Sequence, residues 1–247
     1  MNKYQTSSDQ SLNICQYYAY YLFSCALYIT DQANSVKIVG GQESAPHSIP
    51  WQVALGQKDD VFCGGTLITS QHVLTAAHCT HKPNTYIPFN ARSLFVIVGA
   101  HKIASPIDGI RHTICQYSNH PSYNPRTFDN DFSLFHLNQP VKIGSRVSPV
   151  NLPPPNFGGN FLDNRILRVS GWGRTLDNED APGSAVLLQI NVPGISNSKC
   201  NQPNFYGNRI TGNMLCAGYD SGGIDACAGD SGGKKNGSIY IFLGLNL

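Results

Sequence analysis

Short apolar or alternating runs recur along the chain from Trp51 onward, and none is longer than nine residues. Clusters rich in Gly, Pro, Asn and Asp separate the runs. Such punctuation at short intervals is typical of an all-β barrel or sandwich. We therefore predict strands over residues 51–55, 61–69, 73–77, 94–98, 132–137, 166–169, 185–192 and 239–245.

The turn-forming residues indicate how these strands are grouped. The Pro-rich segment Leu152-Pro153-Pro154-Pro155 lies near the middle of the chain, and we interpret it as a bridge between two β units of similar size. Further along, Asn236-Gly237 precedes an apolar run, which is typical of a type I′ hairpin because both central positions need positive φ. The hairpin explains Asn236 better than its Asn-Gly-Ser glycosylation sequon does.

The composition fits a folded, strand-rich chain. The 247 residues are 41% apolar, which is enough to bury one core or two small ones. Only 13% are charged, which favours short strands and turns over salt-bridged helices. The 17 Lys and Arg residues exceed the 15 Asp and Glu residues by two, and no basic run is longer than two residues. We therefore expect no nucleic-acid partner.

Cysteine content and the amino-terminal segment point to export. Eight cysteines are more than a reduced cytosolic protein of this size usually carries, and none forms a CxxC pair. We interpret them as the disulfide framework of a secreted, extracellular protein. Residues 11–30 are uncharged, and 17–29 have the length of a signal-peptide hydrophobic region, but the tyrosines there make the stretch too polar for a membrane span. A cleaved export signal is expected, with a signal anchor or a mis-assigned first exon as alternatives.

Three motifs could supply nucleophilic hydrolysis, which needs a hydroxyl, a base and a carboxylate that orients the base. Gly229-Asp230-Ser231-Gly232-Gly233 places a serine among glycines, whose backbone N–H groups can approach a substrate carbonyl. A flexible turn explains this string equally well when it is taken alone. The second motif is Thr75-Ala76-Ala77-His78-Cys79. A bridge from Cys63 to Cys79 would pin the His78 turn and stabilise the fold by ~3 kcal/mol, although a lone His is more often a surface residue.

The third motif is Asp129-Asn130-Asp131, which directly precedes an apolar strand. Burial of that strand would draw Asp131 inward. A solvated turn is the alternative, and we expect it to describe Asp129.

In the order His78, Asp131, Ser231, these blocks resemble the trypsin/chymotrypsin family of serine proteases. The resemblance runs from Ile38 to about Leu245 and implies an all-β fold of two six-stranded-type antiparallel barrels, about 38–145 and 155–247, with the active site in the cleft between them. It implies that His78 is the general base and then the acid, that Asp131 orients it, and that Ser231 is the nucleophile. The backbone N–H groups of Gly229 and Ser231 would form the oxyanion hole.

The resemblance also implies activation by cleavage. Lys37-Ile38-Val39-Gly40-Gly41 is similar to the family's activation junction, where the freed amine of Ile38 would pair with Asp230. An unpaired buried carboxylate costs ~3–5 kcal/mol, enough to keep the uncleaved site disordered. Residues 1–37 would then be leader and activation peptide, and 38–247 the protease domain. An ordinary Gly-Gly turn is the alternative explanation.

Specificity and cross-links follow by the same comparison. Asp225 stands six residues before Ser231, at the base of the family's primary pocket, where a carboxylate would select Lys or Arg. A turn Asp is the alternative reading of that residue. Cys200 and Cys216 are expected to form a second disulfide, and Trp172 is expected to pack in the interior.

The chain also departs from the family pattern. Lys234-Lys235 follow Gly233 directly, where members continue Pro-Leu-Val-Cys, and the chain ends at Leu247 before their Ser-Trp-Gly segment. We expect an incomplete second barrel, no usual partner for Cys227, and a buried free thiol at Cys115. A calcium site is not expected, because Ala100 and Arg111 replace the acidic ligands of calcium-binding members.

The leading hypothesis is a secreted serine endopeptidase zymogen that cleaves after Lys or Arg. Its partners would be protein or peptide substrates, an activating protease and protein inhibitors, and the mature chain would be a monomer without a membrane span, cofactor or metal. The main rival is a catalytically weak or inactive homologue that binds a partner. A weaker one is a zinc module built from Cys63, His78, Cys79 and His81, whose spacing fits zinc poorly.

Overall fold

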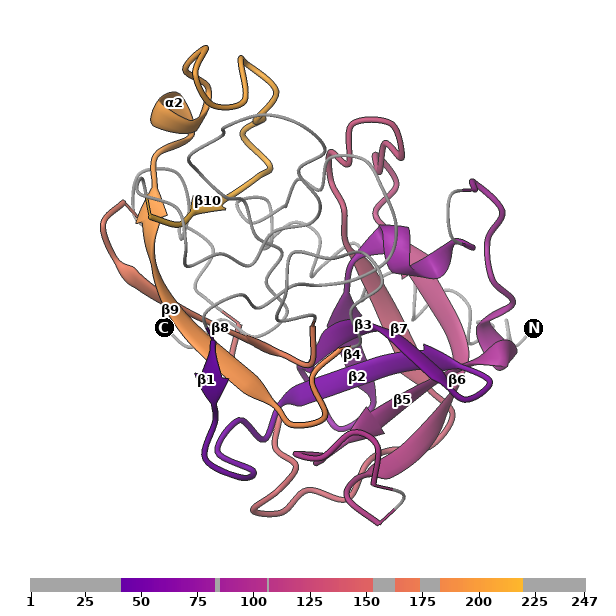
Figure 1. The fold of residues 1–247 in the computed structure, drawn as a ribbon. Helices are drawn as coiled ribbons and strands as arrows, with labels where there is room; N and C mark the ends of the chain where they lie inside the picture. The colour runs from indigo at the N-terminus through magenta and orange to yellow at the C-terminus, as the bar shows by residue number, and fades with distance from the viewer. Residues whose placement is uncertain (1–40, 83–84, 106, 153–162, 174–182, 220–247) are drawn as a thin grey trace, which may run out of the picture.

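A computed structural model describes residues 41–82, 85–105, 107–152, 163–173 and 183–219 (Figure 1). Strands dominate, with little helix. In chain order the strands are β1 (Gln42–Glu43), β2 (Gln52–Gln57), β3 (Asp60–Leu67), β4 (His72–Thr75), β5 (Leu94–Val98), β6 (Ile110–Asn119), β7 (Ser133–Leu137), β8 (Ile166–Gly171), β9 (Leu188–Ile195) and β10 (Cys216–Ala217). The short helices are the 3-10 turns η1 (Ala77–Thr80) and η2 (Ala91–Ser93) and the helix α2 (Asn197–Cys200).

Six of these strands close into an antiparallel barrel in the order β2-β3-β4-β7-β6-β5. Apolar side chains from every strand fill its interior, and Val53, Leu67 and Phe135 are among those with no exposed surface. The glycine at 65 is required by this packing, since a Cβ there would lie 2.8 Å from Cγ1 of Val73. Closure leaves no free edge among these strands.

The second half is an open four-stranded sheet. β9 pairs with β1, β8 and β10, all antiparallel. Alternate residues of β8 and β9 are buried, as expected of strands that cover a core with one face. In Figure 1 the indigo β1 lies against the orange β9, so the first described residues join the second sheet. The prediction of an all-β fold is confirmed, with one closed barrel and, among the described residues, an incomplete second sheet.

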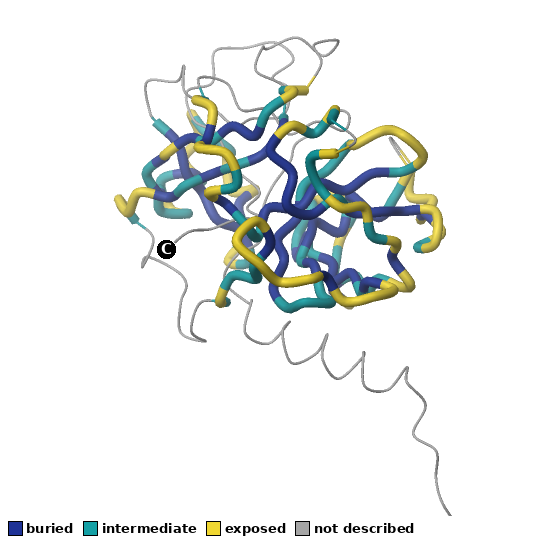
Figure 2. The backbone as a smooth tube through the Cα atoms, turned by 90° about the horizontal axis from the view of Figure 1, so that it is seen from below, coloured by how far each residue is buried: buried dark blue, intermediate teal, exposed yellow. Residues whose placement is uncertain are grey.

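Buried residues join the two halves, and Figure 2 shows the dark blue tube continuing between them. Trp172 packs with Ile49, Ala54 and Leu187 in this cluster, as the sequence predicted for an interior tryptophan. Its Nε1–H donates to the carbonyl oxygen of His101 over 2.9 Å. These contacts give the two halves one fixed relative placement.

The longest strand, β6, was not predicted. Its sequence, IRHTICQYSN, contains few apolar residues, and within it only Ile114 is fully buried. β6 is nevertheless held on both sides, by β5 and by β7. Its place in the barrel therefore comes from backbone pairing with β5 and β7, which the pattern of apolar residues in its sequence does not predict.

Cys115 corrects one expectation. It is a free cysteine, but it is exposed and not buried. The pairing of β6 with β7 shifts register between Ile114 and Gln116, which is the signature of a bulge. Ile114 faces the barrel interior, so the neighbouring Cys115 side chain is directed outward.

Some predicted features lie outside the described residues. They include the hairpin at Asn236-Gly237, the bridge at Pro153–Pro155, and the cysteines of the leader and of position 227. Among the described residues, no helix has the length and apolar character needed to cross a membrane.

Candidate active site

His78 sits on a short turn that two features hold in place. β4 ends at Thr75, and the 3-10 turn η1 follows almost at once. A disulfide between Cys63 and Cys79 ties this turn to β3, as considered from the sequence. Inside the turn, the Thr80 hydroxyl donates to the carbonyl of Ala77 over 2.7 Å. The residue next to His78 is therefore covalently fixed to the barrel wall.

Asp131 reaches His78 because their strands pair. β7 begins two residues after Asp131, and the antiparallel register places Ser133 opposite Thr75. The segments that leave β4 and β7 at this end therefore lie side by side. Two residues 53 positions apart in sequence are brought into contact.

Both oxygens of the Asp131 carboxylate bind His78. The backbone N–H of His78 donates to Oδ1 over 2.8 Å, and the ring nitrogen Nδ1 lies 2.7 Å from Oδ2. A carboxylate can only accept, so Nδ1 carries the proton of the neutral imidazole. Nε2, which lies 3.5 Å from the Cys79 sulfur, is then the unprotonated nitrogen, the form that a general base needs.

Burial strengthens this contact. The Asp131 residue is 1% exposed, whereas the side chain of His78 is 20% exposed. The carboxylate is thus screened from water while the imidazole can meet a reactant. A buried carboxylate held by two hydrogen bonds stabilises the imidazolium that forms when Nε2 takes a proton.

Two aromatic residues that the sequence did not mark lie close to this pair. The ring of Phe128 meets His78 edge-on, with centroids 6.0 Å apart. Burial, then the charge of Asp131 and the nearby Tyr86, raises the pKa of Tyr123 well above its ordinary value, so Tyr123 stays a neutral phenol. Phe128 has a φ of 55°. Phenylalanine seldom adopts this conformation, so the sequence carried no signal that Phe128 would lie beside His78.

Asp129 corrects a further expectation. It is not in a solvated turn: it is half-buried, and its carboxylate accepts hydrogen bonds from the Thr211 hydroxyl over 2.6 Å and from Asn213 Nδ2 over 3.2 Å. Those partners belong to the second half of the molecule. The Asp129 side chain therefore joins the loop that carries Asp131 to a segment more than 80 residues away.

The remaining predicted site residues lie outside the described part of the chain. They are the nucleophile and oxyanion candidates Ser231 and Gly229, the specificity candidate Asp225, and the activation candidates Lys37, Ile38 and Asp230. The structure therefore brings together His78 and Asp131 of the predicted set. It also contains the disulfide between Cys200 and Cys216, which joins α2 to β10.

The residues considered for a metal are engaged in other ways. Cys63, His78 and Cys79 do cluster, but the two sulfurs are bonded to each other and offer no thiolate. His81 turns its Nδ1 to the carbonyl of Ala77 and to the Thr80 hydroxyl. The donor set of a zinc site is not assembled by these four residues.

The positions considered for calcium are likewise unsuited to it. Ala100 is buried and has no ligand atom in its side chain. Arg111 lies over the ring of Phe95, with its Cζ 3.5 Å from the ring centroid, and donates to the carbonyl of Lys58. A guanidinium at this point opposes a cation.

Comparison with known proteins agrees with the geometry. A family model described as Trypsin matches residues 38–234. Cationic trypsin-3 of Rattus norvegicus is 41% identical to this chain over 200 residues, which cover 80% of the chain and 73% of the relative. A buried carboxylate bound to a histidine at the end of a closed barrel is what such a protease requires of its first half. The chain belongs to the trypsin family and is a serine endopeptidase, a hydrolase that acts on proteins.

Proposed function

We propose that the chain is the zymogen of a secreted endopeptidase that cleaves after Lys or Arg through an acyl-enzyme on Ser231. The observation that carries the proposal is the pairing of His78 with a buried Asp131 through both carboxylate oxygens. That arrangement fixes the tautomer and the direction of the base, which a histidine with a merely structural role does not need.

The reaction follows from these roles. The Ser231 hydroxyl attacks the scissile carbonyl and its proton passes to His78 Nε2, while Asp131 holds the Nδ1–H. The tetrahedral oxyanion is received by the backbone N–H groups of Gly229 and Ser231, each worth about 2.7–4 kcal/mol in the transition state. The C–N bond then breaks as His78 returns the proton to the leaving amine. Water repeats the sequence and releases the acid product and the free serine.

Activation and specificity rest on residues of the sequence motifs. Cleavage after Lys37 frees the Ile38 amine, and its pairing with Asp230 orders the oxyanion loop. Asp225 at the base of the pocket forms a charge-assisted hydrogen bond with a Lys or Arg side chain of the substrate. Export is supported by the uncharged stretch 11–30 near the amino terminus and by the two disulfides, which persist in oxidising compartments.

Activity is tested on protein cleaved after Lys37, by labelling with an organophosphonate and by turnover of a Lys or Arg ester. Ser231→Ala is expected to abolish the label and to lower kcat by about 10⁶. Ser198→Ala is the matched control, because Ser198 is exposed, and it is expected to label as the native chain does. Folded, cleaved protein that takes no label would support the partner-binding homologue instead.

Specificity is tested with paired esters of Arg and Leu. Asp225→Ser is expected to reduce kcat/KM for the Arg ester by at least 10²-fold and to leave the Leu ester nearly unchanged, since only the charged side chain loses its partner. Asp59→Ala, at an exposed position, serves as the control for removal of one negative charge. Equal losses on both esters would contradict the role of Asp225.

A further inference from the structure

The Asp129 carboxylate is a junction between the two halves of the molecule. Its Oδ1 accepts from Thr211 Oγ1 over 2.6 Å and from Asn213 Nδ2 over 3.2 Å. Its Oδ2 accepts from Asn130 Nδ2 over 3.2 Å, and Asn213 Nδ2 lies 3.5 Å away. Its backbone carbonyl accepts from the N–H of Asn124 over 2.9 Å. Several donors thus converge on one residue, two positions before Asp131.

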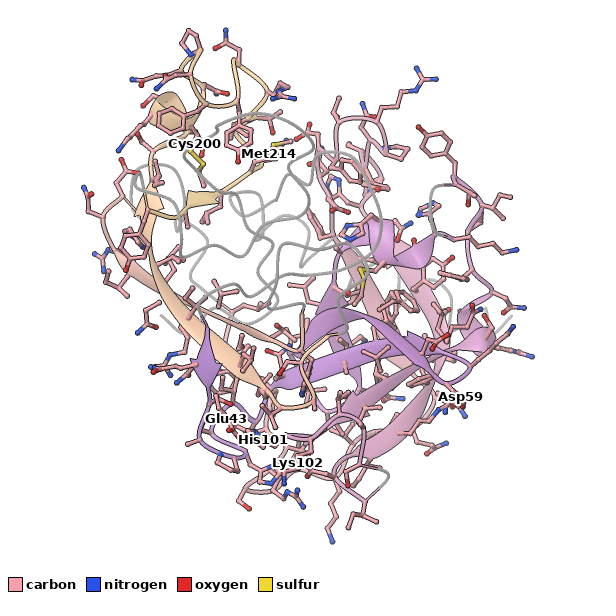
Figure 3. All side chains as sticks on the ribbon, viewed as in Figure 1. Glu43, Asp59, His101, Lys102, Cys200 and Met214 are labelled. Atoms are coloured by element: carbon pink, nitrogen blue, oxygen red, sulfur yellow. A yellow bond between two sulfur atoms is a disulfide. The ribbon has the colours of Figure 1, made fainter. Side chains whose placement is uncertain are left out.

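The partners of Asp129 are themselves held firmly. Asn197 of α2 donates through Nδ2 to the carbonyls of Thr211 and Met214, at 2.8 and 2.9 Å. The disulfide from Cys200 to Cys216 closes the same unit, and its small core contains Met214. Figure 3 labels Cys200 and Met214 in this unit beside α2. The second half therefore offers Asp129 a fixed docking point.

The loop around Asp129 needs such a point. Phe128 and Asn130, on either side of it, have φ values of 55° and 56°. Residues with a side chain seldom adopt this left-handed region, and a pair of them persists only where surrounding contacts hold them. Asn130 donates through Nδ2 to the carbonyl of Ser122 over 3.2 Å, and its own carbonyl accepts the N–H of Phe132 over 2.9 Å. The Asp129 carboxylate adds hydrogen bonds that reach the second half of the molecule, from Thr211 and Asn213.

We propose that Asp129 is a positioning residue for catalysis: through Thr211 and Asn213 it locks the loop that presents Asp131 to His78. The catalytic pair of the first barrel is thereby braced against the second half of the molecule. The inference deepens the proposed function and rests on it for its kinetic readout.

The variants follow from the contact geometry. Asp129→Ala removes every side-chain bond of the junction. Asp129→Asn keeps an oxygen that can accept from Thr211 and Asn213, but it places its NH₂ group against the NH₂ group of Asn130, so that two donors face each other. We therefore expect a loss of activity between that of the native chain and that of Asp129→Ala. Thr211→Val removes the shortest bond with little change of shape. Asp59→Ala is the control for loss of one surface charge.

The measurement is kcat/KM per titrated active site over a range of pH. Asp129→Ala is expected to lose about 10- to 100-fold, chiefly in kcat, as displacement of a positioned group does. The acid limb of its pH profile should move to lower pH, because an imidazolium with a displaced carboxylate is less stable. Thr211→Val should lose less, and the double variant should lose no more than Asp129→Ala, since both changes act on one network.

One nearby titrating group needs its own control. Burial lowers the pKa of His120, and the charge of Asp129 raises it. His120 accepts the N–H of Ser122 at Nδ1. His120→Asn keeps a hydrogen-bond acceptor for the Ser122 N–H and does not titrate. The acid limb of the pH profile of this variant should therefore match that of the native chain.

The outcomes separate this proposal from the proposed function. An unchanged acid limb in Asp129→Ala, with activity lost only through fewer active sites, would overturn the positioning role. If the native chain takes no phosphonate label, the proposed function fails instead. The positioning role is then read by NMR from the low-field resonance of the proton between His78 and Asp131 in Ser231→Ala protein. Asp129→Ala should shift or broaden that resonance, and an unaffected resonance would contradict the inference.

Discussion

Asp108 shows how one carboxylate can organise a loop through backbone hydrogen bonds and an ion pair. It accepts the backbone N–H groups of His101 and Lys102, at 2.9 and 2.6 Å, and it pairs with Arg146. Burial raises the pKa of Asp108, but the two N–H groups, with His47 and Arg146, outweigh burial and hold the pKa below its ordinary value. The charged form therefore stabilises the folded chain.

Asp108→Asn is expected to lower the free energy of unfolding by about 1–3 kcal/mol at pH 7, because bonds to a charged acceptor are lost. A depressed carboxyl pKa adds stability above the unfolded value of 3.8 and loses it as pH falls through the folded value. The gap between variant and native chain should therefore close toward pH 3. Urea unfolding of both proteins at pH 7 and pH 3 measures this difference in the free energy of unfolding. A difference of the same size at both pH values would contradict the role given to the Asp108 charge.

At the scale of elements, the pairing of β4 with β7 brings His78 and Asp131 together at one end of the two strands. At the other end it places two histidines opposite each other. His72 lies opposite His136, with Nε2 and Nδ1 3.0 Å apart. Thr69 Oγ1 accepts the N–H groups of Gln71 and His72, so its hydroxyl proton is directed to His72 Nδ1. His72 then donates through Nε2 to His136 Nδ1, and this hydrogen bond bridges the two strands.

Burial and then the neighbouring His136 lower the pKa of His72 from 6.5. The unfolded chain consequently binds a proton more readily there, and this residue's contribution to stability is present above pH 6.5 and lost as pH falls through the folded value. His72→Phe keeps an aromatic ring but cannot titrate. It should flatten the pH dependence of the free energy of unfolding between pH 7.5 and 5, measured by urea titration at each pH. An unchanged slope would show that another group carries it.

At the scale of the whole molecule, Trp172 holds the barrel and the open sheet together. It is 8% exposed and packs with residues of both halves. Glu43 of β1 and His101 also meet across this boundary, at 2.8 Å, and are labelled side by side in Figure 3. Apolar burial and a few polar contacts together fix how the two halves sit.

Trp172→Ala is expected to cost about 3–5 kcal/mol, because a large buried ring leaves a cavity. Trp172→Phe should cost less, since it retains much of the packing and loses the hydrogen bond to His101, worth about 1 kcal/mol. Denaturant unfolding gives both values. Equal losses in the two variants would mean that the hydrogen bond, and not the packing, joins the halves.

Several features could be predicted from the sequence, because short runs of neighbouring residues or recognisable motifs specify them. The apolar runs predicted the strands that bury a face, including β5 and β7. The resemblance of the motifs around His78 and Asp131 to a known protease family implied that these two residues meet. The bridge between Cys63 and Cys79, considered because Cys79 directly follows His78, is present. The strand signal depends on residues close together in the chain, where side-chain period and turn chemistry act directly.

The tertiary structure decided what depends on contacts distant in sequence. β6 is a strand through its two neighbours, Cys115 lies on its exposed face, and Asp129 reaches Thr211 and Asn213 only when the two halves are assembled. The bridge from His72 to His136 likewise needs the register of β4 with β7. Residue types alone do not predict these pairings, because strand register and the packing of the whole chain determine which residues come into contact.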